Sequence, residues 1–216
     1  MIHNAVKDVD GHSYDAVRIG DQVWLQTDLR AKHYRDGSRI VPAQDEYNYS
    51  DTKPYRVDEY LVEKLCLYNW SAVADPRGLC PRGLARVLQA DWDTLEAFLG
   101  ADSVYVKGKN PKNIAKALSS TQWPDWLEYE EYYAAKAYTV GYRPATTNNA
   151  TGFSAYPWPY YDGRHYGGVS FAAFWIPDAV NESEAGSVKI YGNGVALHKQ
   201  PDLKGYFYAV QCVKGK

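Results

Sequence analysis

The acidic run that contains Glu128, Glu130 and Glu131 has the residue types of a catalytic carboxylate pair. Hydrolysis of a glycosidic bond needs two carboxyl groups about 5 to 10 Å apart across a cleft. Adjacent glutamates in a polar run are more typical of a solvated face. We therefore expect no catalytic role for these glutamates and predict that the protein is not an enzyme.

A thiolate nucleophile at Cys80 would need a histidine or another base beside it. The histidines nearest to it in the sequence, His33 and His165, are both distant, and His165 is more typical of a hydrogen-bonding loop residue. The five histidines are scattered, and the chain has no CxxC or HExxH spacing. We therefore expect no metal site and no cofactor.

Three cysteines allow one disulfide and leave one thiol over. Cys66 lies in an apolar run and is predicted to be a small buried residue. A bridge between Cys80 and Cys212 would suit an exported protein, whereas three thiols would suit a cytosolic one. The cysteines by themselves leave both alternatives open.

Aromatic residues make up 15% of the chain, with 20 Tyr and 7 Trp. Both types combine apolar area with a polar tip, so they suit half-buried strands and also binding surfaces. The most aromatic stretch, residues 156–161, is interrupted by two prolines. We predict that Trp158 packs on the core and that Tyr160 and Tyr161 contact a ligand.

The composition limits the class of protein. A chain of 216 residues with 45% hydrophobic residues can form a packed core, and we expect a single domain over residues 1–216. The formal charge of −2 gives no reason to expect nucleic acid as a partner. No apolar run is long enough to span a membrane, and the first eight residues do not resemble a secretion signal. An export leader, with a possible lipid anchor, would have to be one that has been removed.

Turn residues and periodicity predict the elements. Residues 1–41 should hold an antiparallel hairpin or meander, residues 42–60 a long surface loop, and residues 61–216 the core of the domain. Within that core, a helix should begin at the cap Asp91 and end at Gly100, and a second helix should cover residues 110–119. Alternation predicts strands at residues 169–176, 187–191, 195–198 and 206–213, with turns at 192–194 and 201–205.

Four asparagines fit the glycosylation sequon: Asn48, Asn69, Asn149 and Asn181. Asparagine side chains also hydrogen-bond nearby backbone groups in turns and helix caps. We expect the second role for all four.

A succession of short motifs resembles, in order, the Fibrobacter succinogenes major paralogous domain. The resemblance covers nearly the whole chain, and its ordered motifs make a chance match improbable. They are Val9-Asp10-Gly11, Ile19-Gly20-Asp21-Gln22-Val23-Trp24, Asp28-Leu29-Arg30, Tyr34-Arg35-Asp36-Gly37, Leu67-Tyr68-Asn69-Trp70, Cys80-Pro81, Asp91-Trp92, Asn149-Ala150-Thr151-Gly152-Phe153-Ser154-Ala155, Phe174-Trp175 and Cys212-Val213.

Membership implies an α+β fold related to the C-type lectin-like domains, with antiparallel sheets, two short helices and long loops. In such a fold a disulfide from the loop before the first helix to the final strand would join Cys80 to Cys212. The resemblance also implies an exported, often lipid-anchored protein of the Bacteroidetes type. Two segments depart from the family pattern, at residues 84–87 and at residues 175–178.

The second departure lies where lectin-like folds vary for binding. We therefore place the ligand-binding face around Trp175, Asp178, Tyr191 and Asn193. Gln200-Pro201-Asp202 has the letters of a lectin calcium motif, but a calcium site needs six to eight oxygen ligands, and the partner motif before the last cysteine is absent. We interpret this tripeptide as part of a turn.

The resemblance favours a non-catalytic binding or adhesion module at the cell surface, anchored in the outer membrane or secreted, that recognises a glycan or a surface protein. The alternative is a structural subunit of a surface or fimbria-like assembly. A third hypothesis is an enzyme related to the formylglycine-generating enzymes, which share the lectin-like fold. It is disfavoured because that chemistry uses closely placed cysteines, and the sequence offers no evident pair.

Overall fold

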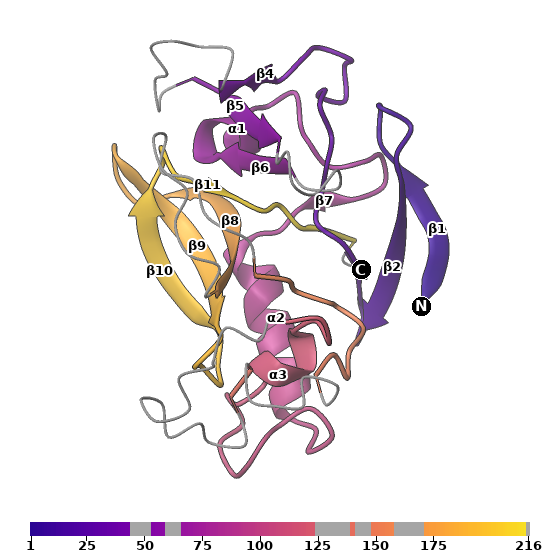
Figure 1. Cartoon of the computed structure of the whole chain (residues 1–216), viewed down its shortest axis with the longest axis vertical. Coiled ribbons are helices and arrows are strands. Elements are labelled where there is room, and N and C mark those ends of the chain that lie inside the picture. The colour runs from indigo at the N-terminus through magenta and orange to yellow at the C-terminus, as the bar shows by residue number, and fades with distance from the viewer. Residues whose placement is uncertain (44–52, 59–65, 124–138, 141–147, 158–170, 215–216) are drawn as a thin grey trace.

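A computed structural model describes residues 1–43, 53–58, 66–123, 139–140, 148–157 and 171–214 (Figure 1). The fold is α+β, with mostly antiparallel sheets and a few short helices. Figure 1 shows a three-stranded sheet on one side of the molecule, the β1–β2 hairpin on the other, and helix α2 between them. No helix in the described residues is long and apolar enough to cross a membrane.

The first sheet joins the two ends of the chain. Its order is β1-β2-β3-β12-β7, and all neighbouring pairs are antiparallel. The predicted N-terminal meander is confirmed, with positive φ at Gly11 and Gly20 in its two turns. The strands are β1 Ile2–Lys7, β2 Ser13–Ile19, β3 Gln22–Leu25, β7 Ala85–Arg86 and β12 Cys212–Lys214.

The second sheet, in the order β11-β6-β5-β4, corrects the predicted surface loop at residues 42–60 for the part of that range that the structure describes, 42–43 and 53–58. Tyr55 and Arg56 in β5 are buried, and the Arg56 guanidinium donates to the Ile40 carbonyl. A buried arginine obscures the alternation by which a strand is recognised in the sequence. The strands are β4 Val41–Pro42, β5 Tyr55–Asp58, β6 Cys66–Asn69 and β11 Phe207–Tyr208.

The third sheet is formed by β8 Phe171–Ala179, β9 Glu184–Tyr191 and β10 His198–Leu203, in the order β10-β9-β8. The predictions for the first two strands are confirmed in outline, but the last strand begins where the predicted strand ends. Pro201 lies within β10 and not in a turn. This is compatible with sheet geometry because β10 is an edge strand, in which a missing backbone N–H is tolerated.

The described part of the chain has three helices between these strands: α1 Trp70–Ala74, α2 Gln89–Gly100 and α3 Ala115–Leu118. Helix α2 begins two residues before the predicted cap. Asp91 lies inside its first turn, where its carboxylate accepts the Leu88 backbone N–H at 2.8 Å. Helix α3 is shorter than the predicted helix at residues 110–119, and the sequence analysis missed α1.

The core consists of two clusters on either side of β8. In the first, Trp92 of α2 meets Trp24 of β3, Phe153 and Phe174 of β8, with ring centroids 5.1, 5.9 and 5.6 Å away. In the second, Trp175 packs with Tyr208, and both cysteines of the disulfide belong to the same cluster. Strand β8 is therefore covered on both faces.

Cys80 and Cys212 form the disulfide that the resemblance implied, with their Cα atoms 5.8 Å apart and a sequence separation of 132. The bond connects the loop before α2 to strand β12 in the first sheet. Cys66 is buried outside this bond, as predicted, and its Sγ lies 3.5 Å from the Arg30 carbonyl.

Three of the four sequon asparagines have the predicted turn and cap roles. Asn69 caps α1 by accepting the Ala72 N–H at 3.2 Å, Asn149 accepts the Ser154 N–H at 2.9 Å, and Asn181 accepts the N–H groups of the turn that precedes β9. Asn48 lies outside the described residues.

Asp10, in the β1–β2 turn, holds the loop after β3 through hydrogen bonds. Its side chain accepts the Lys32 backbone N–H at 2.6 Å and the His33 N–H at 3.2 Å, and it also pairs with the His33 ring. Burial tends to raise the pKa of Asp10, but the hydrogen bonds from His33 and Lys32 outweigh it, so this pKa lies below its ordinary value.

A lowered pKa at Asp10 makes the folded protein sensitive to acid. The stabilisation is present above the ordinary aspartate pKa and is lost as the pH falls through the lowered value. Asp10→Asn should therefore be less stable than wild type at about pH 6, with a gap that narrows towards about pH 3. Denaturant unfolding at both values measures this. Asp178→Asn changes an exposed residue, so its free energy of unfolding should equal that of wild type at both pH values. A stability difference between Asp10→Asn and wild type that stays constant with pH would contradict the interpretation.

Candidate functional site

One face of the third sheet, opposite the first core cluster, combines polar and aromatic side chains. The second core cluster covers this face at Ala173 and Trp175 of β8, and its more exposed part lies at Tyr191, His198 and Gln200. Side chains alternate between the faces of a strand, and opposite residues share a face. The register pairs Phe171 with Tyr191, Lys189 with His198, and Ser187 with Gln200. The opposite face points into the first core cluster. We call the following residues of this face, some exposed and some buried beneath them, the aromatic–polar face: Phe171, Ser187, Lys189, Tyr191, His198, Gln200 and Asp202.

A buried ion pair forms the base of this face. The Lys189 ammonium lies 2.8 Å from an Asp202 oxygen, and the two side chains are only 7% and 10% exposed. Ser187 donates its hydroxyl to the same carboxylate at 2.5 Å. The ammonium also lies 5.0 and 5.1 Å from the ring centroids of Phe171 and Tyr208. These groups satisfy one another, which makes them a rigid support for the side chains above.

Tyr191 is the centre of the exposed part of the face. Its ring centroid lies 5.6 Å from Phe171 and 5.1 Å from His198, and its hydroxyl donates to the Gln200 side-chain oxygen at 3.3 Å. Burial, and then the charge of Asp202, raise the pKa of Tyr191, so its hydroxyl remains a neutral donor. An aromatic surface edged by an amide and an imidazole can stack on a sugar ring or peptide and hydrogen-bond its polar groups.

Trp175 is placed differently from the sequence prediction. It is 2% exposed, its indole N–H donates to the Tyr68 carbonyl at 2.8 Å, and its ring lies 4.7 Å from that of Tyr208. This placement argues against a role in ligand binding. The second core cluster covers the Trp175 side of β8, which the sequence alone does not reveal.

Asp178 and Asn193 are both exposed but do not belong to one site. The register that pairs Phe171 with Tyr191 also pairs Ala179 with Ala185. Asp178 is therefore about 23 Å along the strand from Phe171, at roughly 3.3 Å per residue. Asn193 lies in the turn that follows Tyr191. Of the four residues predicted for this face, only Tyr191 and Asn193 lie at the same end of the sheet.

Several predicted residues lie outside the described part of the chain. They are Tyr160, Tyr161, Trp158, His165, Glu128, Glu130 and Glu131. For Tyr160 and Tyr161 ligand contact remains a prediction.

The sequence analysis missed every member of the face except Tyr191, including the more exposed residues His198 and Gln200. The signal was present in the polar alternation of His198, Gln200 and Asp202, which occupy every second position. Interpreting Pro201 as a turn residue hid it.

Asp8, Asp10 and His12 form a group whose potential metal-ligating atoms all lie within 4.8 Å of one another. Each is already used in the β1–β2 turn: Asp8 accepts from the Tyr14 hydroxyl at 2.6 Å and pairs with His12 at 2.9 Å, and Asp10 holds His33. These hydrogen bonds account for the group as part of a turn.

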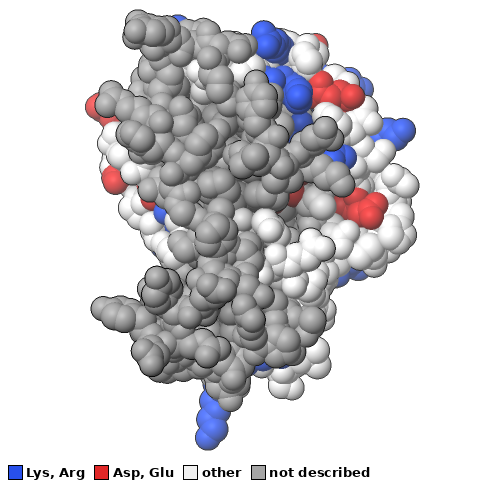
Figure 2. Space-filling view, viewed as in Figure 1, with Lys and Arg blue, Asp and Glu red and all other residues white. Residues whose placement is uncertain are grey.

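On the face in Figure 2, Lys and Arg are interspersed with Asp and Glu among the described residues.

The chain forms an α+β domain with mostly antiparallel sheets and a few short helices. A disulfide bond joins the loop before α2 to its last strand. The chain belongs to the Fibrobacter succinogenes major domain family, whose model matches residues 17–214, and this confirms the resemblance found in the sequence. The family consists of surface-associated domains. Comparison with curated proteins and with solved structures found no match.

Proposed function

We propose that this protein is a non-catalytic binding module of the cell surface that recognises a glycan through the aromatic–polar face. The observation that carries the proposal is the partly exposed ring of Tyr191, held between Phe171 and His198 with the Gln200 amide at its edge. The rings and the amide are positioned by β-strands, which limits the entropy lost on binding. A surface protein is the other partner that such a face fits, and the experiment below separates the two.

The disulfide supports a surface location. Such bonds form and persist in oxidising compartments outside the cytosol. Cys80 and Cys212 use both sulfurs in one bond, and Cys66 is buried, which also disfavours the cysteine chemistry of formylglycine-generating enzymes. Outer-membrane anchoring through a lipid, or secretion, is part of the same proposal.

We also propose that the fold is related to the C-type lectin-like domains. The support is topological: the bridge runs from the loop before α2 to the final strand, β12, and β12 pairs with β3 from the beginning of the chain. A lectin-like relationship would suit glycan recognition. The function itself is tested at the aromatic–polar face, independently of this relationship.

Binding to a glycan array tests the proposed function directly. Wild type should bind a defined subset of glycans saturably, and Tyr191→Ala should weaken that binding about tenfold or more, because a central aromatic residue contributes much of the affinity. Tyr105→Ala is the matched control, since it removes the same ring from a different contact, with Phe98 of α2. A blank array, or equal losses in both variants, would contradict glycan binding at this face.

The alternative, a structural subunit of a surface assembly, is favoured by one observation. Strand β1 is an edge strand of the first sheet, and Ile2 within it is 41% exposed. Exposed edge strands can pair with a strand of another chain. A blank array together with a stable complex in a native pull-down would support this alternative.

A further inference from the structure

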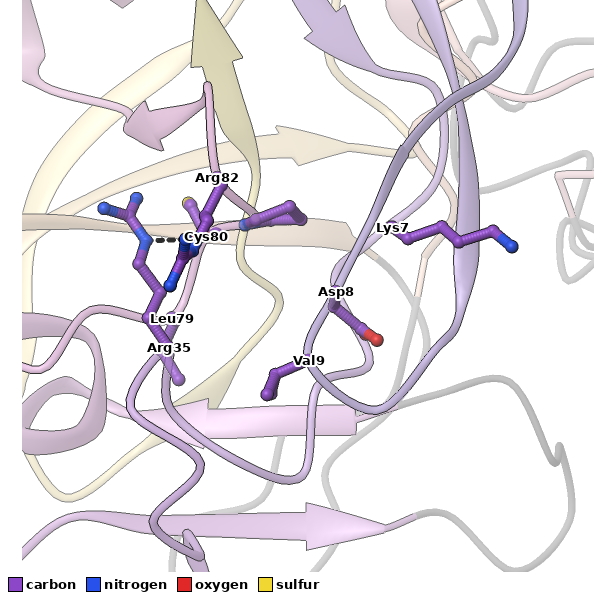
Figure 3. Close-up of a pocket in the computed structure, with 8 residues that line it drawn as sticks. Lys7, Asp8, Val9, Arg35, Leu79, Cys80 and Arg82 are labelled. Atoms are coloured by element: carbon purple, nitrogen blue, oxygen red, sulfur yellow. Dashed lines mark hydrogen bonds between the residues drawn. The ribbon is translucent and has the colours of Figure 1, made fainter.

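A pocket with a volume of about 200 Å³ lies between the β1–β2 turn and the loop that carries Cys80 (Figure 3). It is on a different part of the molecule from the aromatic–polar face. Its lining includes three cationic residues, Lys7, Arg35 and Arg82, and one carboxylate, Asp8. The pocket therefore carries a surplus of positive charge.

Arg35 forms one wall of the pocket, and hydrogen bonds hold its side chain in place. Its Nε donates to the Cys80 carbonyl at 2.5 Å and its Nη2 donates to the Leu84 carbonyl at 2.7 Å, while its backbone N–H bonds to Gly78 at 3.0 Å. The disulfide fastens the same loop to β12. The pocket is thus pre-formed, and a ligand would not have to order this loop on binding.

The carboxylate of Asp8 is already compensated. One oxygen accepts the His12 backbone N–H at 2.9 Å, and the other accepts the Tyr14 hydroxyl at 2.6 Å and lies 2.9 Å from the His12 ring nitrogen. Both oxygens of Asp8 therefore have their hydrogen-bond partners within the β1–β2 turn and the start of β2. Arg82 and Lys7 are exposed, and neither forms a side-chain hydrogen bond or ion pair with any residue in the described part of the chain. In Figure 3, Lys7 extends away from the Cys80 loop, whereas Arg82 lies on that loop.

The size of the pocket limits what it can hold. Pockets for drug-sized ligands usually measure about 300 to 1,000 Å³, so this one fits a smaller group. We propose that it binds a small oxyanion: a sulfate, phosphate or carboxylate group, contacted by Arg82 and placed in the positive field of Arg35. Guanidinium groups match the planar, bidentate geometry of such anions. The anion can be free in solution or carried by a sugar, and the two sources share this chemistry.

Calorimetric titration of the intact, oxidised protein at low ionic strength tests the proposal, with inorganic sulfate, inorganic phosphate, glucuronate and, as a neutral reference, glucose. At least one of the three anions should bind saturably and glucose should not. Arg82→Gln should raise the Kd of that anion about tenfold, since it removes a charged hydrogen-bond donor. Raising the salt concentration should also weaken binding.

Arg18→Gln is the matched control, because Arg18 is exposed on β2 five residues beyond Ser13, whose partner is Lys7. It makes the same change of charge about 17 Å along the strand from the pocket. Tighter binding of glucuronate than of sulfate or phosphate would support the proposal with a sugar as carrier, and the reverse order would support it with a free anion. Absence of saturable binding of all three anions, or equal losses in Arg82→Gln and Arg18→Gln, would overturn it. Neither result depends on Tyr191.

Discussion

Replacing both Cys80 and Cys212 by serine should lower the free energy of unfolding by roughly 4 to 5 kcal/mol, the largest effect expected in this molecule. The bond closes a loop across 132 residues of sequence, and the chain-entropy model gives a long closed loop the greatest stabilisation. It is also the covalent connection between the loop before α2 and the strand that completes the first sheet. Equilibrium unfolding in denaturant measures the loss.

Two controls separate the bond from the thiols. Cys66→Ala removes a buried thiol that is outside the bond, and should cost only about 1 kcal/mol. Wild type treated with reductant should unfold at the midpoint of the double serine variant. If reduction leaves the wild-type midpoint unchanged, the bond does not stabilise the protein as described.

Asp202→Asn should lower the free energy of unfolding by about 3 to 5 kcal/mol, because it leaves the Lys189 ammonium buried without its counter-charge. The two side chains are 7% and 10% exposed, so water can compensate little. Lys189→Met combined with Asp202→Leu should recover much of the loss, since an apolar pair of similar volume removes both desolvation costs. Denaturant unfolding of the wild type, Lys189→Met, Asp202→Leu and the double variant forms a complete cycle.

Asp178→Asn is the matched control for this second prediction. It makes the same substitution at an exposed position of the same sheet and should change stability by no more than about 0.5 kcal/mol. If Asp202→Asn costs as little as Asp178→Asn, the ion pair is not the rigid base of the aromatic–polar face, and the positions of Tyr191 and Gln200 must have another origin.

The N-terminal meander and helix α2 could be predicted from local sequence signals. Gly11 and Gly20 adopt the positive φ that hairpin turns favour, so the meander could be predicted from its turn residues. Trp92, Leu95 and Leu99 recur at helical spacing, and all three are buried on one face of α2. The disulfide required the family resemblance, because three cysteines alone leave the pairing open.

The remaining elements depend on tertiary contacts that a sequence does not display. Helix α1 has only five residues, too few for a periodic pattern, although Asn69 gave a cap signal. Arg56 is buried in β5 because it reaches the Ile40 carbonyl, a partner 16 residues away. Pro201 is tolerated in β10 only because that strand lies at the edge of its sheet.

The candidate site could be predicted only in part, because the burial of its side chains also depends on tertiary contacts. Tyr191 was predicted from the family resemblance, as part of the region where lectin-like folds vary for binding. Trp175 was predicted to bind ligand because it begins the segment, residues 175–178, that departs from the family pattern. Here Phe174 and Trp175 point into two different core clusters, so neither face of β8 is open at that point.

The central claim is that ligand binds on the aromatic–polar face, and chemical-shift mapping tests it most directly. Isotope-labelled protein would be titrated with a glycan selected on the array. The backbone amides of Phe171, Tyr191 and His198 should shift together and saturate at the same ligand concentration. Saturable shifts confined to another region, such as the β1–β2 hairpin, with these three amides unmoved, would contradict the claim.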